Sequence, residues 1–283
     1  MERITAAVLG APIDAVSWDA ALSRIQGWAA RNESRSVFIC NVHSVVTTQH
    51  DPAFAQALAA ADMATPDGAP VAWLMRWLGH SNQRRISGPD LMWRYCRAAA
   101  IKGEGIFLYG AALNTLDLLE QSLLAAFPRL KICGKRSPPF RAMTAEEDQQ
   151  DVDLINQSGA SVVWVSLGCP KQELWMAAHA GRVQAVRLGV GAAFDFHAGT
   201  VARAPEWLRR RGLEWLHRLA CEPRRLGRRY LVTNSNSLLV RWCNWLGNGC
   251  AKPAASTSAD RCRVYALPEC SLSACRVVRA TPC

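Results

Sequence analysis

The sequence predicts an α/β protein, with a Rossmann-like parallel sheet covered by helices and a C-terminal helical appendage rich in arginine and tryptophan. Short apolar runs alternate with longer helical patterns through the first 200 residues, which is typical of a parallel sheet with helices on both faces. After Thr200 the strand signals stop, and a helical pattern continues to about Leu246. Half of the residues are hydrophobic, so the chain has ample material for a buried core.

Four apolar runs predict buried strands, since strands covered on both faces are apolar throughout. They lie at 36–41, 105–109, 161–167 and 185–190. Helical patterns lie between these runs, at 52–61, 69–79, 89–101, 112–127, 144–157 and 170–180. Two helices have start signals, because Ser87-Gly-Pro-Asp90 precedes one and Thr144 is the expected N-cap of another. Ligands of such sheets bind beyond the carboxyl ends of the strands.

The distribution of charge divides the chain into three predicted parts. The formal net charge is +10, and residues 203–241 hold ten arginines against three glutamates. Because a charge that serves only solubility would be dispersed, this concentration predicts a local binding surface. We therefore expect an α/β domain at 1–202, a helical appendage at 203–247 and a disordered, cysteine-rich tail at 248–283.

Several classes of protein are excluded by the sequence. It contains no stretch that predicts a membrane-spanning helix, and its N-terminus lacks the long apolar core of a secretory signal. Six cysteines stand singly in apolar context, as reduced core cysteines do: Cys40, Cys96, Cys133, Cys169, Cys221 and Cys243. The other five crowd the end of the chain without a C-x-x-C pair. We therefore expect a cytosolic protein without a zinc site.

Four predicted loops contain polar residues that a simple connecting loop does not need. They are Asn41-Val42-His43-Ser44, Thr65-Pro66-Asp67-Gly68, residues 166–173 and residues 189–199. Each alone is compatible with turn chemistry, and Asp-Gly is a common turn pair. The sequence has no G-x-G-x-x-G at the first strand and no Walker sequence, which excludes the standard dinucleotide and P-loop sites.

Taken together, seven motifs resemble the WecG/TagA/CpsF family of glycosyltransferases. They are N-V-H, T-P-D-G, R-I-S-G-P-D-L, G-C-P-K-Q-E, G-V-G-A-A-F-D-F-x-A-G, R-A-P-E-W and G-L-E-W-L-x-R-L-x-x-E-P-x-R, in the family's order over about residues 10–245. The resemblance implies transfer of a sugar from a UDP-sugar to a polyprenyl-diphosphate-linked sugar, with inversion and with neither metal ion nor cofactor. It implies a place in the synthesis of cell-wall polymer or cell-surface polysaccharide.

Two features depart from the family. Ile39 stands where members often carry threonine, so a hydroxyl at that position is not available in this chain. The cysteine-rich end after about residue 248 resembles no part of the family.

The resemblance implies that Asp67 is the base that takes the proton of the acceptor hydroxyl. The alternative is that Asp67 only caps the helix that follows. Without a divalent ion the leaving diphosphate needs fixed positive charge, for which Lys171 and Arg85 are candidates, although Arg85 is equally compatible with a solvated side chain. His43 is either an assisting or a structural imidazole, and Glu173 is expected to be structural. The candidate hydrogen-bond partners of the sugar or uridine are Asn41, Gln172 and Asp195.

Residues 203–231 combine arginine, which suits phosphate, with tryptophan, which suits the boundary between water and acyl chains. We expect this segment to be a membrane anchor and a lid whose arginines reach a diphosphate. The residues expected to do this are Arg203, Arg210, Arg218, Arg224, Arg225, Arg228, Trp207 and Trp215. The protein would then be cytoplasmic and peripheral on the inner face of the plasma membrane. The alternative is a packed helical subdomain with a solvated basic face.

A basic nucleic-acid-binding protein is the alternative function, because the isoelectric point is near 9.3 and arginine is concentrated late in the chain. Two observations argue against nucleic acid as a partner: Glu206, Glu214 and Glu222 are interleaved with Trp207 and Trp215, and the sequence has no helix-turn-helix, zinc-finger or RNP pattern. A membrane adaptor without activity is a third alternative, against which the Asp67 loop argues. The expected partners are a nucleotide-sugar donor, a polyprenyl-diphosphate-linked acceptor and an anionic membrane surface. The sugar stays open, and so does the oligomeric state, a homo-oligomer included.

Overall fold

The computed structural model describes residues 3–210 and residue 214, with side chains up to Leu208 and at Glu214. Contacts within the chain separate two units, Met1–Arg241 and Trp242–Cys283, and all described residues belong to the first. The predicted tail at 248–283 therefore lies outside the described residues, and so does most of the predicted appendage at 203–247.

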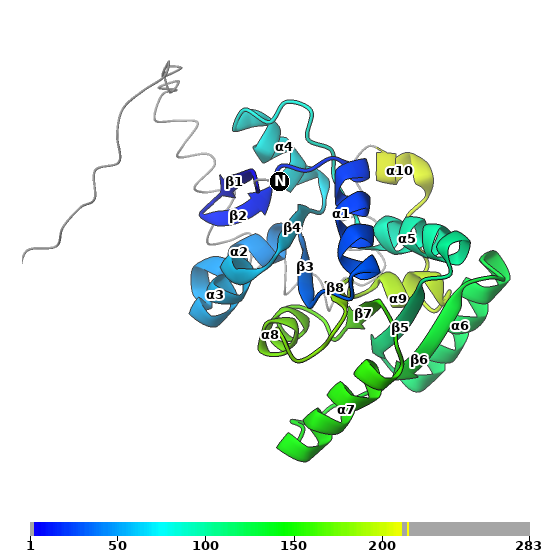
Figure 1. Cartoon of the computed structure of the whole chain (residues 1–283). Coiled ribbons are helices and arrows are strands. Elements are labelled where there is room, and N and C mark those ends of the chain that lie inside the picture. Colours follow the sequence, from blue (N-terminus) through cyan, green and yellow to red (C-terminus); the bar gives the residue numbers. More distant parts are fainter. Residues whose placement is uncertain (1–2, 211–213, 215–283) are drawn as a thin grey trace, which may run out of the picture. The chain divides into compact units, whose positions relative to one another are not determined.

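A six-stranded parallel sheet forms the centre of the described part, as the sequence predicts (Figure 1). Its strands are β3 (Arg35–Cys40), β4 (Met63–Pro66), β5 (Gly105–Gly110), β6 (Lys131–Arg136), β7 (Val162–Ser166) and β8 (Val186–Gly189). Their order is β4-β3-β8-β7-β5-β6, and all neighbours are parallel. An antiparallel hairpin of β1 (Thr5–Val8) and β2 (Ala11–Asp14) precedes the sheet in the sequence. Because the six strands point the same way, their carboxyl ends meet at one edge.

Helices pack against both faces of the sheet. One face is covered by α1 (Trp18–Ala30), α5 (Gly88–Lys102), α6 (Leu113–Ala126) and α9 (Ala193–His197). The other is covered by the β1–β2 hairpin, α2 (Val42–His50), α3 (Pro52–Ala60), α4 (Ala69–Trp77), α7 (Ala145–Gln157) and α8 (Lys171–Ala178). The last described helix is α10 (Glu206–Arg210).

Side chains of the central strands alternate between two apolar cores, one on each side of the sheet. In β3, Val37 and Ile39 pack into the core that includes α1 and α5. Phe38 and Cys40 pack into the core that includes α3 and α8. Both sets are buried, which explains why the sequence of this strand is apolar throughout.

The sequence does not predict β1, β2, β4 or β6, and the structure shows why. β4 has only four residues and overlaps the Thr-Pro-Asp-Gly turn signal, while β6 is a half-exposed strand at the edge of the sheet. Cys133 in β6 is exposed, so the expectation that it belongs to the core is wrong. Cys40 and Cys96 are buried and free, as expected.

Among the helices, α1, α2 and α9 are not predicted. The predicted loop Asn41-Val42-His43-Ser44 is wrong, because α2 begins at Val42 with Asn41 as its N-cap. Thr144 does cap α7, in a capping box with Glu147, as its sequence indicates.

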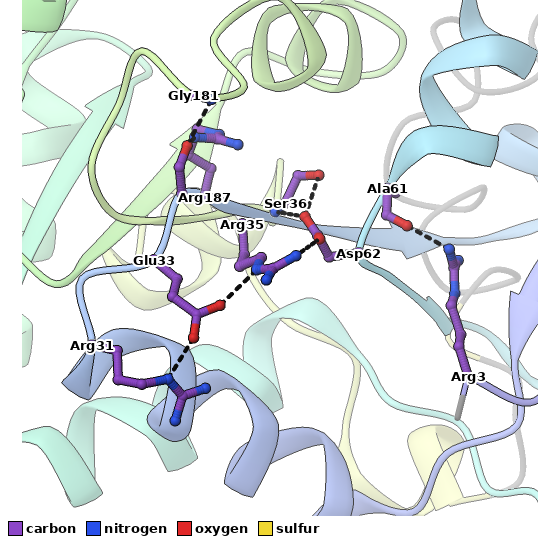
Figure 2. A network of polar contacts seen from close by, with 10 residues as sticks. Arg3, Arg31, Glu33, Arg35, Ser36, Ala61, Asp62, Gly181 and Arg187 are labelled. Atoms are coloured by element: carbon purple, nitrogen blue, oxygen red, sulfur yellow. Dashed lines mark hydrogen bonds and ion pairs between the residues drawn. The ribbon is translucent and has the colours of Figure 1, made fainter. Parts of the chain in front are cut away.

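The amino end of the sheet carries a network of ion pairs (Figure 2). Glu33 accepts hydrogen bonds from Arg31 Nε at 2.5 Å and from Arg35 Nε at 2.7 Å. Arg35 Nη1 also donates to Asp62 at 2.7 Å. None of these four side chains belongs to the predicted site, so we assign the network to the fold.

Arg187 of β8 lies fully buried in the same region (Figure 2). Its Nη1 donates to Ser34 Oγ at 2.8 Å and to Val183 O at 3.0 Å. Its Nε and Nη2 have no hydrogen-bond partner among the described residues. Burial disfavours the charged guanidinium and lowers the pKa of Arg187 to about 10. Packing of β8 between β3 and β7 therefore offsets an unfavourable buried charge.

Candidate active site

Candidate residues from four segments lie at the carboxyl edge of the sheet. In the order of the strands they follow, these residues are Asp67 after β4, Asn41 after β3, Asp195 beyond β8, and Lys171 and Gln172 beyond β7. Because neighbouring strands are about 4.8 Å apart, the four strand ends span only about 15 Å. The structure thus brings together the residues that the sequence predicts beyond the carboxyl ends, while their roles stay predictions.

Asp67 is fixed at this edge through its backbone and its side chain. Its N–H donates to Cys40 O at 2.8 Å, and its Oδ1 accepts from Gly68 N at 2.7 Å. Gly68 occupies the N-cap position of α4 at φ 81°, a conformation that favours glycine, and no side chain caps this helix. The alternative that Asp67 is the helix cap is therefore wrong.

The segment between α4 and α5 packs against the Asp67 loop. Ile86 N donates to Pro66 O at 2.7 Å, which ties this segment to the end of β4. Gly88 lies against the end of β8, where an added Cβ would lie 3.4 Å from Val190 O. These contacts explain why R-I-S-G-P-D and T-P-D-G, though separate in sequence, form one surface.

Asn41 uses its side-chain oxygen for the fold. Its Oδ1 accepts from His43 N at 2.9 Å and from Ser44 N at 3.2 Å, which caps α2. A ligand at this position would therefore meet the amide nitrogen of Asn41, which is a donor.

Gln172 lies deep in the same edge and is only 4% exposed. Its Nε2 donates to Glu173 Oε1 at 2.8 Å, and Nε2 lies 3.1 Å from the position of a Cβ added to Gly189. Its Oε1 is buried and has no hydrogen-bond partner among the described residues. Because nearly all buried acceptors in folded proteins are paired, this unpaired oxygen singles out Gln172 for a role beyond packing.

Lys171 and Asp195 are both less buried than Gln172. Lys171 begins α8 and is exposed, so its ammonium group is accessible to an anion. Asp195 is half-buried on α9, and its carboxylate accepts from Thr200 Oγ1 at 3.5 Å.

Arg85 belongs to a cluster of ion pairs. Its Nη1 donates to Glu214 Oε2 at 3.1 Å, and its side chain is 21% exposed, so the alternative of a solvated arginine is wrong. Arg203 Nη1 pairs with Asp90 at 2.8 Å, and Arg203 Nε lies 3.7 Å from Glu214. Burial opposes the ionisation of Asp90, but hydrogen bonds from Arg203 and Ser87 outweigh it and keep the pKa of Asp90 below its ordinary value.

A cavity of about 260 Å³ adjoins this cluster, lined by Trp18, Arg85, Asp90, Trp93 and Arg94. Arg94 lies over the Trp18 ring, 4.4 Å from its centroid. His197 stacks on Trp93 at 4.9 Å, and its Nε2 donates to Pro89 O at 2.9 Å. Burial lowers the pKa of His197, which favours the neutral imidazole. The sequence does not predict the two tryptophans, because only the packing of α1 on α5 brings them together.

The sequence contains an Asp-x-Asp pattern, Asp151-Val152-Asp153, of the kind that holds the metal ion in metal-dependent glycosyltransferases. It lies inside helix α7 rather than in a loop after a strand. Asp151 is buried and accepts from Tyr109 OH at 2.9 Å and from Arg136 Nε at 2.7 Å. The structure therefore assigns this pattern to the fold.

Most of the predicted membrane-binding residues lie outside the described residues, namely Arg218, Arg224, Arg225, Arg228 and Trp215. Arg210 is the last residue of α10, and Trp207 in the same helix is exposed. Within residues 3–210, no helix has the length and apolar character that crossing a bilayer requires.

The fold and the site define an α/β enzyme whose polar groups gather beyond the carboxyl ends of parallel strands. Residues 6–249 match the model of the "Glycosyl transferase WecG/TagA/CpsF family". The chain belongs to this family and is a glycosyltransferase.

A curated relative supports the same assignment. The chain is 31% identical over 197 residues to an N-acetylglucosaminyldiphosphoundecaprenol N-acetyl-beta-D-mannosaminyltransferase of Bacillus spizizenii. The match covers 69% of this chain and 74% of the relative.

Proposed function

We propose that this glycosyltransferase transfers a sugar from a UDP-sugar to a polyprenyl-diphosphate-linked sugar, in the synthesis of a cell-wall polymer or cell-surface polysaccharide. The observation that carries the proposal is the gathering of Asp67, Asn41, Gln172 and Asp195 at one edge of the sheet. The name of the Bacillus spizizenii relative supports the acceptor class, since that enzyme acts on a sugar linked to diphosphoundecaprenol.

Asp67 is the proposed general base. It accepts the proton of the acceptor hydroxyl while that oxygen attacks the anomeric carbon of the donor from the face opposite the diphosphate. The bond from the anomeric carbon to the diphosphate oxygen breaks in the same step, and UDP leaves with the electron pair. A single displacement of this kind inverts the configuration at the anomeric carbon.

Positive charge stabilises the leaving diphosphate in this proposal. The exposed Lys171 lies at the edge beyond β7, and Arg85 and Arg203 lie in the ion-pair cluster beside α5. Each arginine already has an acidic partner, which fixes its guanidinium before the donor arrives. Fixed donors aimed at developing charge are worth more than mobile ones.

Gln172 is the proposed acceptor for a hydroxyl or N–H group of the donor. A carboxylate only accepts hydrogen bonds, so the bond to Glu173 turns the amide nitrogen toward Glu173 and leaves Oε1 to accept from a ligand. Leaving such an acceptor unpaired costs about 1–3 kcal/mol, which a ribose or sugar hydroxyl would offset. Glu173 is then a positioning residue that sets the polarity of Gln172.

The change Glu173→Met is expected to raise the KM for the donor about five- to tenfold, with a smaller effect on kcat, because Gln172 loses the partner that orients it. Steady-state kinetics with varied donor measures this split. Glu173→Gln is the matched control, since its amide oxygen still accepts from Gln172, and it should stay close to wild type. Equal loss in both variants would show that Glu173 acts through its charge instead.

Transfer activity is expected to persist in excess EDTA. The Asp-x-Asp pattern lies on α7, where Asp151 forms an ion pair with Arg136. In the proposed mechanism, the cationic side chains near the carboxyl edge of the sheet take the place of a divalent ion. Initial rates with and without EDTA, followed by addition of Mn²⁺, test this. A loss in EDTA that Mn²⁺ restores would contradict the metal-free mechanism.

The decisive experiment for the function is transfer itself. The purified enzyme is incubated with a panel of UDP-sugars and a short-chain polyprenyl-diphosphate-sugar acceptor, and the products are separated by mass. One donor is expected to extend the acceptor by a single sugar. No product with any UDP-sugar would exclude this donor class.

Because the proposed acceptor is lipid-linked, we also propose that the enzyme lies at the inner face of the plasma membrane.

A further inference from the structure

The outward face of α4 exposes two tryptophans. Trp73 is 51% exposed and Trp77 is 55% exposed. Residues four apart lie one turn from each other on the same side of a helix, so the two rings share a face. Leu78, directly after the helix, is exposed as well, while Met75 on the opposite side packs into the core. Large apolar groups gathered on an exposed face mark an interaction surface more often than a solvated one.

The charge around this face is positive. From Gly68 to Pro89 the sequence contains three arginines and no aspartate or glutamate. Arg76, on α4, and Arg84, in the segment that follows it, are exposed. Tryptophan with arginine on one helical face suits the interface of an anionic bilayer, where the rings reach the acyl boundary and the cations meet the headgroups.

The position of α4 ties this face to the active site (Figure 1). The helix begins at Ala69, two residues after Asp67, and Trp73 lies about 6 Å along the helix axis from Ala69. A surface that holds α4 at the headgroup level therefore holds the carboxyl edge of the sheet close to the same level. The sugar of a lipid-linked acceptor lies just above its diphosphate, within such a distance of the bilayer.

We propose that the face of α4 formed by Trp73, Arg76, Trp77 and Leu78 docks on an anionic lipid surface. Its docking presents Asp67 to an acceptor held in the bilayer, in addition to any binding that the segment after Arg203 supplies. The reason to dock there rests on the proposed lipid-linked acceptor, but the docking itself is measured without any substrate.

The test uses the full chain and the double variant Trp73→Gln/Trp77→Gln, with Ile101→Gln/Phe140→Gln as the control at two exposed apolar positions elsewhere. Flotation with vesicles of equal phosphatidylglycerol and phosphatidylcholine gives the partition coefficient. The α4 variant is expected to bind at least about tenfold more weakly, and the control to bind like wild type. With phosphatidylcholine alone, wild-type binding is expected to fall as well, because the arginines lose their counter-charge.

Activity with two acceptors separates docking from catalysis. A water-soluble, short-chain acceptor should be used by the α4 variant as by the wild type, whereas a long-chain acceptor in vesicles should be used less, in proportion to the bound fraction. Unchanged vesicle binding would overturn the proposal. So would dissociation of an oligomer with vesicle binding intact, which would make this face a contact between copies. If the wild-type enzyme used neither acceptor, the proposed function would be wrong. The flotation experiment would still test the docking of α4, because it needs no substrate.

Discussion

Replacing Asp67 with asparagine is expected to lower turnover by about two to four powers of ten, the usual contribution of a general base. Asparagine has nearly the same shape, and its side-chain oxygen can still accept from Gly68 N, so the loop and α4 should keep their structure. What is lost is the group that takes the proton of the acceptor hydroxyl. Steady-state rates with saturating donor and acceptor measure the effect, and the KM for the donor should change little.

A carboxylate far from the edge is the matched control for this substitution. Asp153 is exposed on α7, and Asp153→Asn is expected to retain wild-type turnover. Turnover of Asp67→Asn close to that of the control would remove Asp67 from the mechanism. It would not return Asp67 to helix capping, because Gly68 holds that position.

Truncation after Ala202 is expected to abolish transfer while leaving a folded protein. The eight strands of the described residues and helices α1 to α9 precede the cut, so the sheet and both of its cores are retained. The cut removes Arg203 and Glu214, which leaves Asp90 and Arg85 without these ion-pair partners beside the cavity. It also removes the arginines and tryptophans expected to meet the membrane, so most binding to anionic vesicles should be lost, apart from what α4 supplies.

The control for truncation is a chain that ends at Gly247 and lacks only the cysteine-rich tail. It is expected to keep transfer activity and vesicle binding, while circular dichroism confirms the fold of both shortened proteins. Full activity in the protein that ends at Ala202 would make the segment after Arg203 dispensable and would favour a packed subdomain with a solvated basic face.

The central strands and most of the helices could be predicted because their sequences are periodic or apolar throughout. β3 and β7 are buried on both faces, so their composition alone indicates strands. β6 could not be found in this way, because a half-exposed edge strand with Lys131, Lys135 and Arg136 is as polar as a loop. Asn41 shows a different limit, since a helix N-cap and a polar loop residue look alike in sequence.

The candidate site could be predicted in part. Asp67, Gln172 and Asp195 lie in segments that follow strands, and a parallel sheet brings such segments together. The ion pair of Arg85 with Glu214 joins residues 129 positions apart, and no local pattern indicates it. The cavity lined by Trp18 of α1 and by Trp93 and Arg94 of α5 is not predicted either, because these two helices become neighbours only in the folded chain.

The place of β8 in the sheet has a consequence for how the protein is made. Among the described strands β8 is the last to leave the ribosome, yet it lies between β3 and β7 and pairs with both. Until β8 has emerged, β3 and β7 therefore each expose an edge that β8 covers in the finished sheet. Open edges invite pairing with other chains, and long-range strand pairing is slow. Chaperone dependence during synthesis should accordingly end once β8 has emerged.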